Sequence, residues 1–215
     1  MTEAELRELI CEVGRRMYAR NLVAATDGNI SVRLGPDRFL CTPSGVSKGF
    51  MRRQDLVIAD GRGHRIAGEN RVTSEFFTHL AAYEERPDIA AVVHAHPPMA
   101  VALMIAGRGM TEPVLPEVVM ALGAVPTCAY ATSGSREGAA VVRELIRTHD
   151  AVLLDRHGSL SVGPDLLDAY FKLEKIEHAA QTLWAAQALG TLRVLDASQI
   201  ARLRESGANY REGGE

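Results

Sequence analysis

The sequence has few cysteines, and their arrangement excludes two kinds of protein. Cys11, Cys41 and Cys128 are odd in number, far apart and free of any Cys-x-x-Cys spacing. A domain stapled by disulfides or a cysteine-rich structural zinc site would need closely spaced pairs. Three unpaired thiols fit a reducing compartment, so we expect a cytoplasmic protein.

Long apolar runs and blocks of one charge are also missing. No stretch approaches the length that crosses a bilayer, and no signal peptide opens the chain, so we expect a soluble protein with no membrane partner. The formal net charge is −3, and the many arginines are scattered among acidic residues rather than gathered into a patch. We therefore expect no nucleic-acid partner.

The composition is that of a globular chain with one core. The chain has 215 residues, of which 47% are hydrophobic, and one domain is the default for this length. We predict a single domain over residues 1–206 and a mobile tail over residues 207–215, which is rich in glycine and polar residues.

The order of helical and strand patterns predicts an α/β fold. A capping box at Thr2 and Glu5 opens a first helix, a second helix is expected to begin at Thr73 as its N-cap, and Pro164 is expected to open the longest helix. A last helical piece is expected near residues 197–205. Because strands and helices do not alternate strictly and hairpins recur, we predict a mixed central sheet with helices on both faces.

Two histidines follow a short apolar run that is typical of a buried strand. Residues two apart in a strand face the same side, so His94 and His96 point the same way, and Pro97 ends the strand just beyond them. Two imidazoles at the carboxyl end of a strand suggest a metal site, which needs further ligands. Alone, this pattern is equally compatible with two histidines that only form hydrogen bonds at a sheet edge.

A third histidine shares this position and favours the metal. His157 leaves the end of the buried strand at residues 151–154, and we expect Gly158 to make the turn that brings its ring back. Glu75 is the best fourth ligand. Three imidazoles and one further group are typical of a catalytic zinc site. We interpret the remaining histidines as surface or helix-face residues: His64, His79, His149 and His178.

A second group of residues could bind an anion. Its members offer an amide, hydroxyls and backbone N–H groups, and two of them lie where a helix N-terminus would favour negative charge: Asn29, Ser44, Gly45, Thr73 and Ser74. These features suit a phosphate. The same residue types are also ordinary turn and cap residues, and composition alone favours that simpler interpretation.

Taken together, the motifs resemble the class II aldolase/adducin family, and within it the fuculose-phosphate aldolase-like enzymes. The resemblance runs from about residue 5 to residue 190, in the order and at the spacings of the family. Each motif alone is weak, and together they are highly specific: Gly28-Asn29-Ile30-Ser31, Thr42-Pro43-Ser44-Gly45, Thr73-Ser74-Glu75, Val93-His94-Ala95-His96, Tyr130-Ala131-Thr132 with Gly134, and Asp155-Arg156-His157-Gly158.

The resemblance implies a three-layer α/β/α fold and a homotetramer with active sites between subunits. It implies one zinc ion per subunit, held by His94, His96 and His157, with Glu75 as a resting-state ligand and the catalytic acid/base. It implies that the anion-binding group holds the phosphate of a phosphorylated sugar. A catalytic tyrosine in the family's C-terminal tail has a possible counterpart in Tyr210.

The implied activity is that of a metal-dependent aldolase. Such an enzyme cleaves a ketose 1-phosphate reversibly to dihydroxyacetone phosphate and an aldehyde through a metal-stabilised enediolate. The alternative to a metal is a Schiff base on lysine. Lysine is scarce here, since Lys172 and Lys175 lie on a predicted long helix and Lys48 follows a loop, with no buried site evident. The metal route is therefore preferred.

Two departures from the family pattern leave the sugar open. Where the aldolase has a tyrosine near the aldehyde, the matching region reads Leu115-Pro116-Glu117-Val118, and Ser133 replaces a phenylalanine. The epimerase branch typically carries aspartate at the position of Glu75, so glutamate favours an aldolase. The dehydratase and decarboxylase branches share the histidines and remain open. A non-enzymatic adducin-like interaction module would have lost zinc ligands that are retained here.

Overall fold

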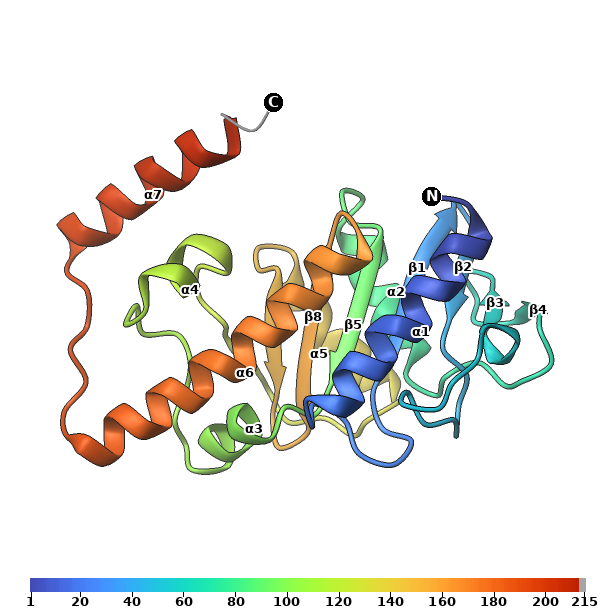
Figure 1. Cartoon of the computed structure of the whole chain (residues 1–215), viewed down its shortest axis with the longest axis horizontal. Helices are drawn as coiled ribbons and strands as arrows, with labels where there is room; N and C mark the ends of the chain where they lie inside the picture. The colour runs from blue at the N-terminus through green and yellow to red at the C-terminus, as the bar shows by residue number, and fades with distance from the viewer. Residues whose placement is uncertain (213–215) are drawn as a thin grey trace.

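The computed structural model describes residues 1–212, and within its last helix the side chains of residue 204 and residues 206–212 lie outside the described part. Figure 1 shows a central sheet covered by helices. The strands are β1 (Asn29–Gly35), β2 (Arg38–Cys41), β3 (Val57–Ala59), β4 (Arg65–Ala67), β5 (Ala91–Ala95), β6 (Thr127–Cys128), β7 (Ala151–Leu154) and β8 (Gly158–Gly163). The helices are α1 (Glu3–Ala19), α2 (Phe76–Glu85), α3 (Pro98–Ile105), α4 (Pro116–Ala121), α5 (Arg136–Ile146), α6 (Leu166–Leu189) and α7 (Ala197–Glu212), and a 3-10 turn spans Arg53–Asp55.

The strands form one eight-stranded sheet in the order β4-β3-β2-β1-β5-β8-β7-β6. Neighbouring strands are antiparallel except β6 and β7, which are parallel. The prediction of a mixed, largely antiparallel sheet is confirmed. Because β5 and β7 are both antiparallel to β8, which lies between them, they run the same way and their carboxyl ends meet at one edge of the sheet.

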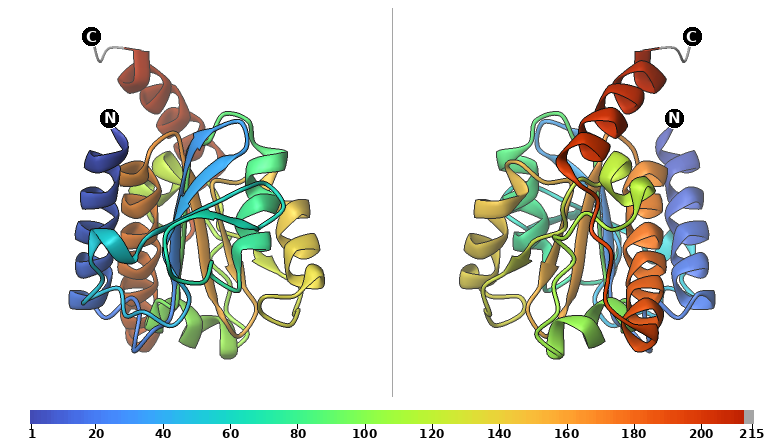
Figure 2. Two further views of the ribbon diagram at one scale, coloured as in Figure 1. Left: turned by 90° about the vertical axis from the view of Figure 1, so that its right-hand side faces the viewer. Right: turned by 90° about the vertical axis from the view of Figure 1, so that its left-hand side faces the viewer.

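Helices cover both faces of the sheet, which confirms the three-layer α/β/α fold. Figure 2 shows α1 and α6 on one face and α2 and α5 on the other. Val93 of β5 packs in the cluster of α1 and α6, whereas Val92 packs in the cluster of α2 and α5. This alternation places His94 on the α2 side of the sheet, because it lies two residues beyond Val92.

Helix boundaries follow local capping, and two predicted starts are wrong. α1 begins at the expected capping box, in which the Thr2 hydroxyl accepts from the Glu5 N–H at 3.3 Å. α2 begins at Phe76 rather than after Thr73, because a turn closed by the Phe76 N–H and the Thr73 carbonyl precedes it. Pro164 lies outside α6, since the side chain of Asp165 caps that helix.

The C-terminal helix stands apart from the main body. α7 follows an extended segment and packs near α4 (Figure 1). It continues to Glu212, so the expected end near residue 205 is wrong. The expected mobile tail at residues 207–215 overlaps the end of α7 up to Glu212, and its last three residues lie outside the described part of the chain. Among the described residues, no helix has both the length and the hydrophobicity to span a bilayer.

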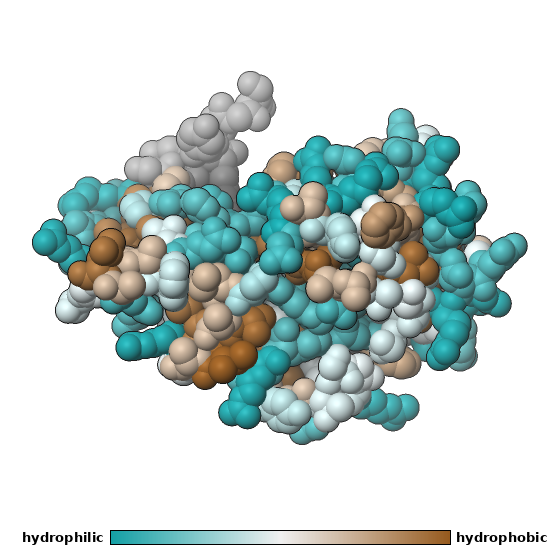
Figure 3. Space-filling view, turned by 60° about the horizontal axis from the view of Figure 1, so that its bottom comes forward, coloured by the Kyte–Doolittle hydropathy of each residue, from teal (hydrophilic) through white to brown (hydrophobic). Residues whose placement is uncertain are grey.

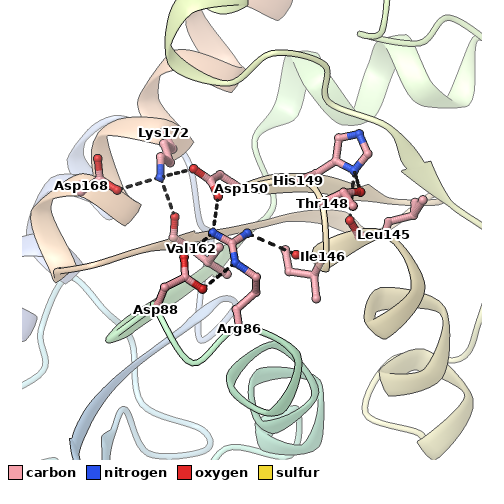
Figure 4. A network of polar contacts seen from close by, with 10 residues as sticks. All are labelled: Arg86, Asp88, Leu145, Ile146, Thr148, His149, Asp150, Val162, Asp168 and Lys172. Carbon is pink, nitrogen blue, oxygen red and sulfur yellow. Dashed lines mark hydrogen bonds and ion pairs between the residues drawn. The ribbon is translucent and has the colours of Figure 1, made fainter. Parts of the chain in front are cut away.

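An ion-pair network joins the end of α2, the start of β7 and α6 (Figure 4). Asp150, just before β7, accepts from Arg86 at 2.9 Å with one carboxylate oxygen and from Lys172 at 2.8 Å with the other. Arg86 also pairs with Asp88 at 2.7 Å. Lys172 further contacts Asp168 and the Val162 carbonyl. The network ties α2, β7 and α6 together.

We expect Asp150→Ala to lower the free energy of unfolding by about 2 kcal/mol. It removes the one carboxylate shared by two cations whose side chains are only 18% and 11% exposed, which leaves each with fewer partners. The loss is smaller than for a fully buried pair because Asp150 itself is one-third exposed. Urea unfolding would measure the change. Asp88→Ala is the matched control, with an expected loss below about 1 kcal/mol. Equal losses in the two variants would contradict this account.

Candidate metal and anion site

The structure brings the three predicted histidines together. His94 lies in β5, His96 just beyond it, and His157 in the turn between β7 and β8. One ring nitrogen from each lies within 4.8 Å of the others. The cause is the topology, because β5 and β7 end at the same edge of the sheet on either side of β8.

The turn that carries His157 is built differently from the prediction. The left-handed residue is Arg156, with φ of 57°, and not Gly158. Gly158 is needed for another reason. A Cβ atom on it would lie 2.2 Å from the carbonyl oxygen of Ala95 and 2.9 Å from the His96 ring. Glycine therefore allows β8 to start directly against the end of β5.

One ring nitrogen of each histidine is directed toward the middle of the cluster. His94 Nδ1 lies 2.9 Å from the Ser159 carbonyl, to which it must donate, so Nε2 is the nitrogen that is left to bind a metal ion. His96 Nδ1 faces the Asp27 carboxylate at 3.5 Å. The two Nε2 atoms therefore oppose each other at 3.1 Å. Burial is the main cause that lowers the pKa of His157 to about 4, so this ring is neutral.

Glu75 completes a set of four groups that fits a metal ion. Its Oε2 lies 3.3 Å from His94 Nε2, and its Oε1 lies 3.5 Å from His157 Nε2. Two atoms bound to one tetrahedral zinc at about 2.0–2.1 Å would stand roughly 3.4 Å apart. The distances from Glu75 to His94 and His157, and the 3.1 Å between His94 and His96, are close to this value. Two imidazole nitrogens 3.1 Å apart need either a shared proton or a cation between them, and a metal ion would meet this need.

Two hydrogen bonds hold the Glu75 carboxylate. Asn29 Nδ2 donates to Oε2 at 2.7 Å, and Ser133 Oγ donates to Oε1. Burial alone would raise the pKa of Glu75, but the His94 ring and these two donors outweigh it and hold the pKa far below its usual value. The carboxylate is therefore ionised and has a fixed orientation.

A cavity of about 240 Å³ opens beside this cluster. All five predicted anion-binding residues line it: Asn29, Ser44, Gly45, Thr73 and Ser74. Glu75, His96 and His157 line it too, so the cavity and the metal-binding groups are continuous. Gly45 has φ of 73°, a conformation that favours glycine. The arrangement can hold an anion next to a metal ion.

The comparison with known families decides the assignment of the chain. Residues 8–184 match the Class II Aldolase and Adducin N-terminal domain family. The chain belongs to this family. The resemblance seen in the sequence motifs is confirmed. The family is metal-dependent, and the three-histidine group is its candidate ligand set in this chain.

Similar proteins of this family are named for two reactions. A 3-oxo-tetronate 4-phosphate decarboxylase of Haemophilus influenzae is 32% identical over 96% of this chain and 100% of its own length. An L-fuculose phosphate aldolase of Methanococcus maripaludis is 36% identical over 82% of this chain and 94% of its own length. A solved L-fuculose 1-phosphate aldolase has a TM-score of 0.87 and 28% identity, and the match covers 96% of this chain and 97% of that one.

Pro116 and Glu117, from the region expected on the aldehyde side, do not line the cavity. The region at Pro116 and Glu117 forms α4, which packs against α6 and α7. Tyr210 belongs to α7, and its side chain lies outside the described residues. A catalytic role for Tyr210 remains a prediction.

Three residues near the site escaped the sequence reasoning. Lys48 is buried, contrary to expectation, and its ammonium group donates to the carbonyls of Thr26 and Val46, each at 2.8 Å. Burial lowers its pKa to about 8. Ser133 contacts Glu75, although the sequence identified it only as a departure from the family. His79, interpreted as a surface or helix-face residue, is fully buried.

Proposed function

We propose that this protein is a zinc-dependent aldolase that cleaves a ketose 1-phosphate reversibly to dihydroxyacetone phosphate and an aldehyde. The observation that carries the proposal is the position of Glu75. It is an ionised carboxylate in contact with two imidazoles of the metal cluster, and it also lines the anion cavity. The named L-fuculose phosphate aldolases among its relatives support the same reaction.

The anion cavity fixes the substrate. We assign the phosphate to Asn29, Ser44, Gly45, Thr73 and Ser74, which all line the cavity. Holding the phosphate restricts the reacting carbons to the neighbourhood of Glu75, which lowers the entropic part of the barrier. Zinc bound by His94, His96, His157 and Glu75 would supply a Lewis acid for the negative charge that develops on substrate oxygen.

Glu75 moves the proton. In the direction of synthesis, its carboxylate takes a proton from the carbon of dihydroxyacetone phosphate that becomes the nucleophile, and the electron pair of that C–H bond forms the new C–C bond with the aldehyde. The π electrons of the aldehyde move to its oxygen, which takes up a proton to become the new hydroxyl. In cleavage the same proton returns to that carbon. Asn29 and Ser133 keep the carboxylate oriented.

Decarboxylation is a second candidate, and one observation favours it. The Haemophilus influenzae relative covers almost the whole of both chains and is named for the decarboxylation of 3-oxo-tetronate 4-phosphate. Loss of carbon dioxide from a 3-oxo acid leaves its electron pair next to a carbonyl group, as aldol cleavage does. The same Lewis acid and anion cavity would serve both reactions.

A substrate panel separates the two reactions. We expect the zinc-loaded protein to release dihydroxyacetone phosphate from one or more ketose 1-phosphates, to lose this activity with a chelator and to regain it with zinc. Ketose 5-phosphates and 3-oxo-tetronate 4-phosphate complete the panel, and carbon dioxide is measured in parallel. Carbon dioxide without dihydroxyacetone phosphate would establish the decarboxylase instead. Stoichiometric metal with neither product would overturn both proposals.

Buried Lys48 makes a control for the lysine route necessary. Its ammonium group donates to two carbonyls, which occupies the nitrogen that a Schiff base would need. Borohydride added during turnover should therefore leave the mass of the protein unchanged. A mass increase equal to the reduced substrate, located on Lys48, would contradict the metal route.

We also propose a homotetramer with active sites between subunits. α7 extends away from the main body (Figure 1), and large apolar side chains remain exposed, among them Ile105, Trp184 and Leu189. Hydrophobic residues gather in separate patches on the side shown in Figure 3. Light scattering of the purified protein would measure the assembly, and a monomer would contradict it.

A further inference from the structure

A chain of buried polar side chains leads from Glu75 into the layer between the sheet and α2. Asn29 Nδ2 donates to Glu75 Oε2 at 2.7 Å, and Asn29 Oδ1 lies 2.5 Å from His79 Nε2. His79 Nδ1 lies 2.7 Å from Ser31 Oγ, which lies 2.9 Å from the Tyr83 hydroxyl. All of these residues except Glu75 are buried. The family assignment gives no role to this row of hydrogen-bonded side chains.

The spacing of the residues explains how the chain is built. Asn29 and Ser31 lie two apart in β1, so both face α2. Glu75, His79 and Tyr83 lie four apart, so they stand one above another on the side of α2 that faces β1. The two sets interleave, and each residue of the helix meets its partner on the strand.

The direction of the hydrogen bonds at His79 follows from the amide of Asn29. Its NH₂ group donates to Glu75, and its oxygen, which can only accept, faces His79 Nε2. His79 Nε2 must then carry the hydrogen. Burial lowers the pKa of His79 to about 3, so the ring is neutral and has a single N–H. Its Nδ1 must accept from the hydroxyl of Ser31.

The opposite arrangement is unfavourable as a whole. With hydrogen on His79 Nδ1, the Nε2 lone pair would face an oxygen of Asn29 unless that amide turned round. A reversed amide would place its oxygen against the Glu75 carboxylate. Buried polar groups without a partner cost about 1–3 kcal/mol each, and more when a charge is involved. The tautomer of His79 and the orientation of Asn29 are therefore coupled.

We propose that His79 is a positioning residue which, as the Nε2–H tautomer, holds the amide N–H groups of Asn29 toward Glu75 and the anion cavity. One amide hydrogen orients the carboxylate, and the second serves an anion in the cavity that Asn29 lines. The effect on turnover rests on the proposed function. The tautomer and the effect on anion binding do not.

The tautomer is measured directly by nitrogen NMR. Protein labelled with ¹⁵N-histidine and loaded with zinc should show His79 with hydrogen on Nε2 and an unprotonated Nδ1. The signal is assigned by its disappearance in His79→Gln. Hydrogen on Nδ1 would overturn the proposal, because the amide of Asn29 would then have to be reversed. The tautomer is read from the wild-type protein without substrate, and the variant serves only to assign the signal.

A pair of polar variants tests the consequence. In His79→Gln, the side-chain amide is long enough to donate a hydrogen bond from the position of Nε2. In His79→Asn, the shorter side chain places its amide nitrogen only at the position of Nδ1. We expect His79→Asn to lower kcat/KM by about 10- to 100-fold and to weaken the binding of inorganic phosphate measured by calorimetry. His79→Gln should recover most of both. Equal losses in the two variants, or losses that only follow their melting temperatures, would overturn the proposal in favour of packing.

A double-mutant comparison isolates Asn29 as the intermediary. With Asn29→Ala in place, His79→Gln and His79→Asn should bind inorganic phosphate equally, because the group that His79 positions is gone. A Gln-over-Asn advantage that persists without Asn29 would overturn the proposal. If the proposed reaction itself is wrong, kcat is not measurable, yet the tautomer and the phosphate affinities still decide the role of His79.

Discussion

Replacing His94 with alanine is expected to reduce the metal content of the purified protein from stoichiometric to a trace and to abolish turnover. His94 is 1% exposed, and its Nε2 faces both His96 and Glu75. Loss of a group that only orients a ligand already weakens metal binding about 10- to 100-fold. Loss of a ligand at the centre of the set should exceed that.

The measurement is elemental analysis after dialysis against zinc at limiting concentration, together with the product assay. His157→Ala should behave in the same way, because its ring contributes the third nitrogen. His178→Ala is the matched control, since His178 lies exposed on α6 and should change neither metal content nor rate. Full metal occupancy in both His94→Ala and His157→Ala would defeat the assignment of the site.

The metal cluster could be predicted because its determinants are local. His94 and His96 share a face through the two-residue period of a strand, and His157 follows a second apolar run. The rule that ligands gather at the carboxyl ends of strands supplied the rest. The residue types suggested an anion site, but only the family resemblance favoured it over ordinary turns and caps, because serine, threonine and glycine in a loop have many other causes.

The residues that sequence reasoning missed depend on distant contacts. Ser133 meets Glu75 across 58 positions, and His79 meets Asn29 across 50. No local pattern reports such a pair. The role of His79 could have been found only by comparing the spacing of polar residues in β1 with their spacing in α2. Polar residues two apart in a buried strand, opposite polar residues four apart on the next helix, predict an interleaved network.

The wrong boundaries also have physical causes. Thr73 has the side chain of a good N-cap, but the Thr73 carbonyl closes a turn before the helix, which moves the start of α2 to Phe76. Gly158 was expected to supply a left-handed turn, whereas it provides room for the carbonyl of Ala95. In both cases the residue type was informative and its purpose was set by a neighbouring segment.

Glu75→Gln is expected to keep the fold and the metal while lowering turnover by about 10²- to 10⁴-fold, the usual contribution of a general acid–base group. Glutamine has the same shape, and its oxygen can accept from Asn29 while its NH₂ donates to Ser133. No buried group is left unpaired, so the variant removes proton transfer without removing packing. The three histidines remain to hold the metal.

Glu84→Gln is the matched control, because it makes the same chemical change on the same helix at an exposed position. It should leave turnover unchanged. The rate of proton exchange between dihydroxyacetone phosphate and deuterated water, followed without any aldehyde, isolates the step assigned to Glu75. Near-normal exchange in Glu75→Gln would reject its role in proton transfer. If the variant loses proton exchange but keeps its full metal content, the loss is due to the missing base and not to a missing metal ion.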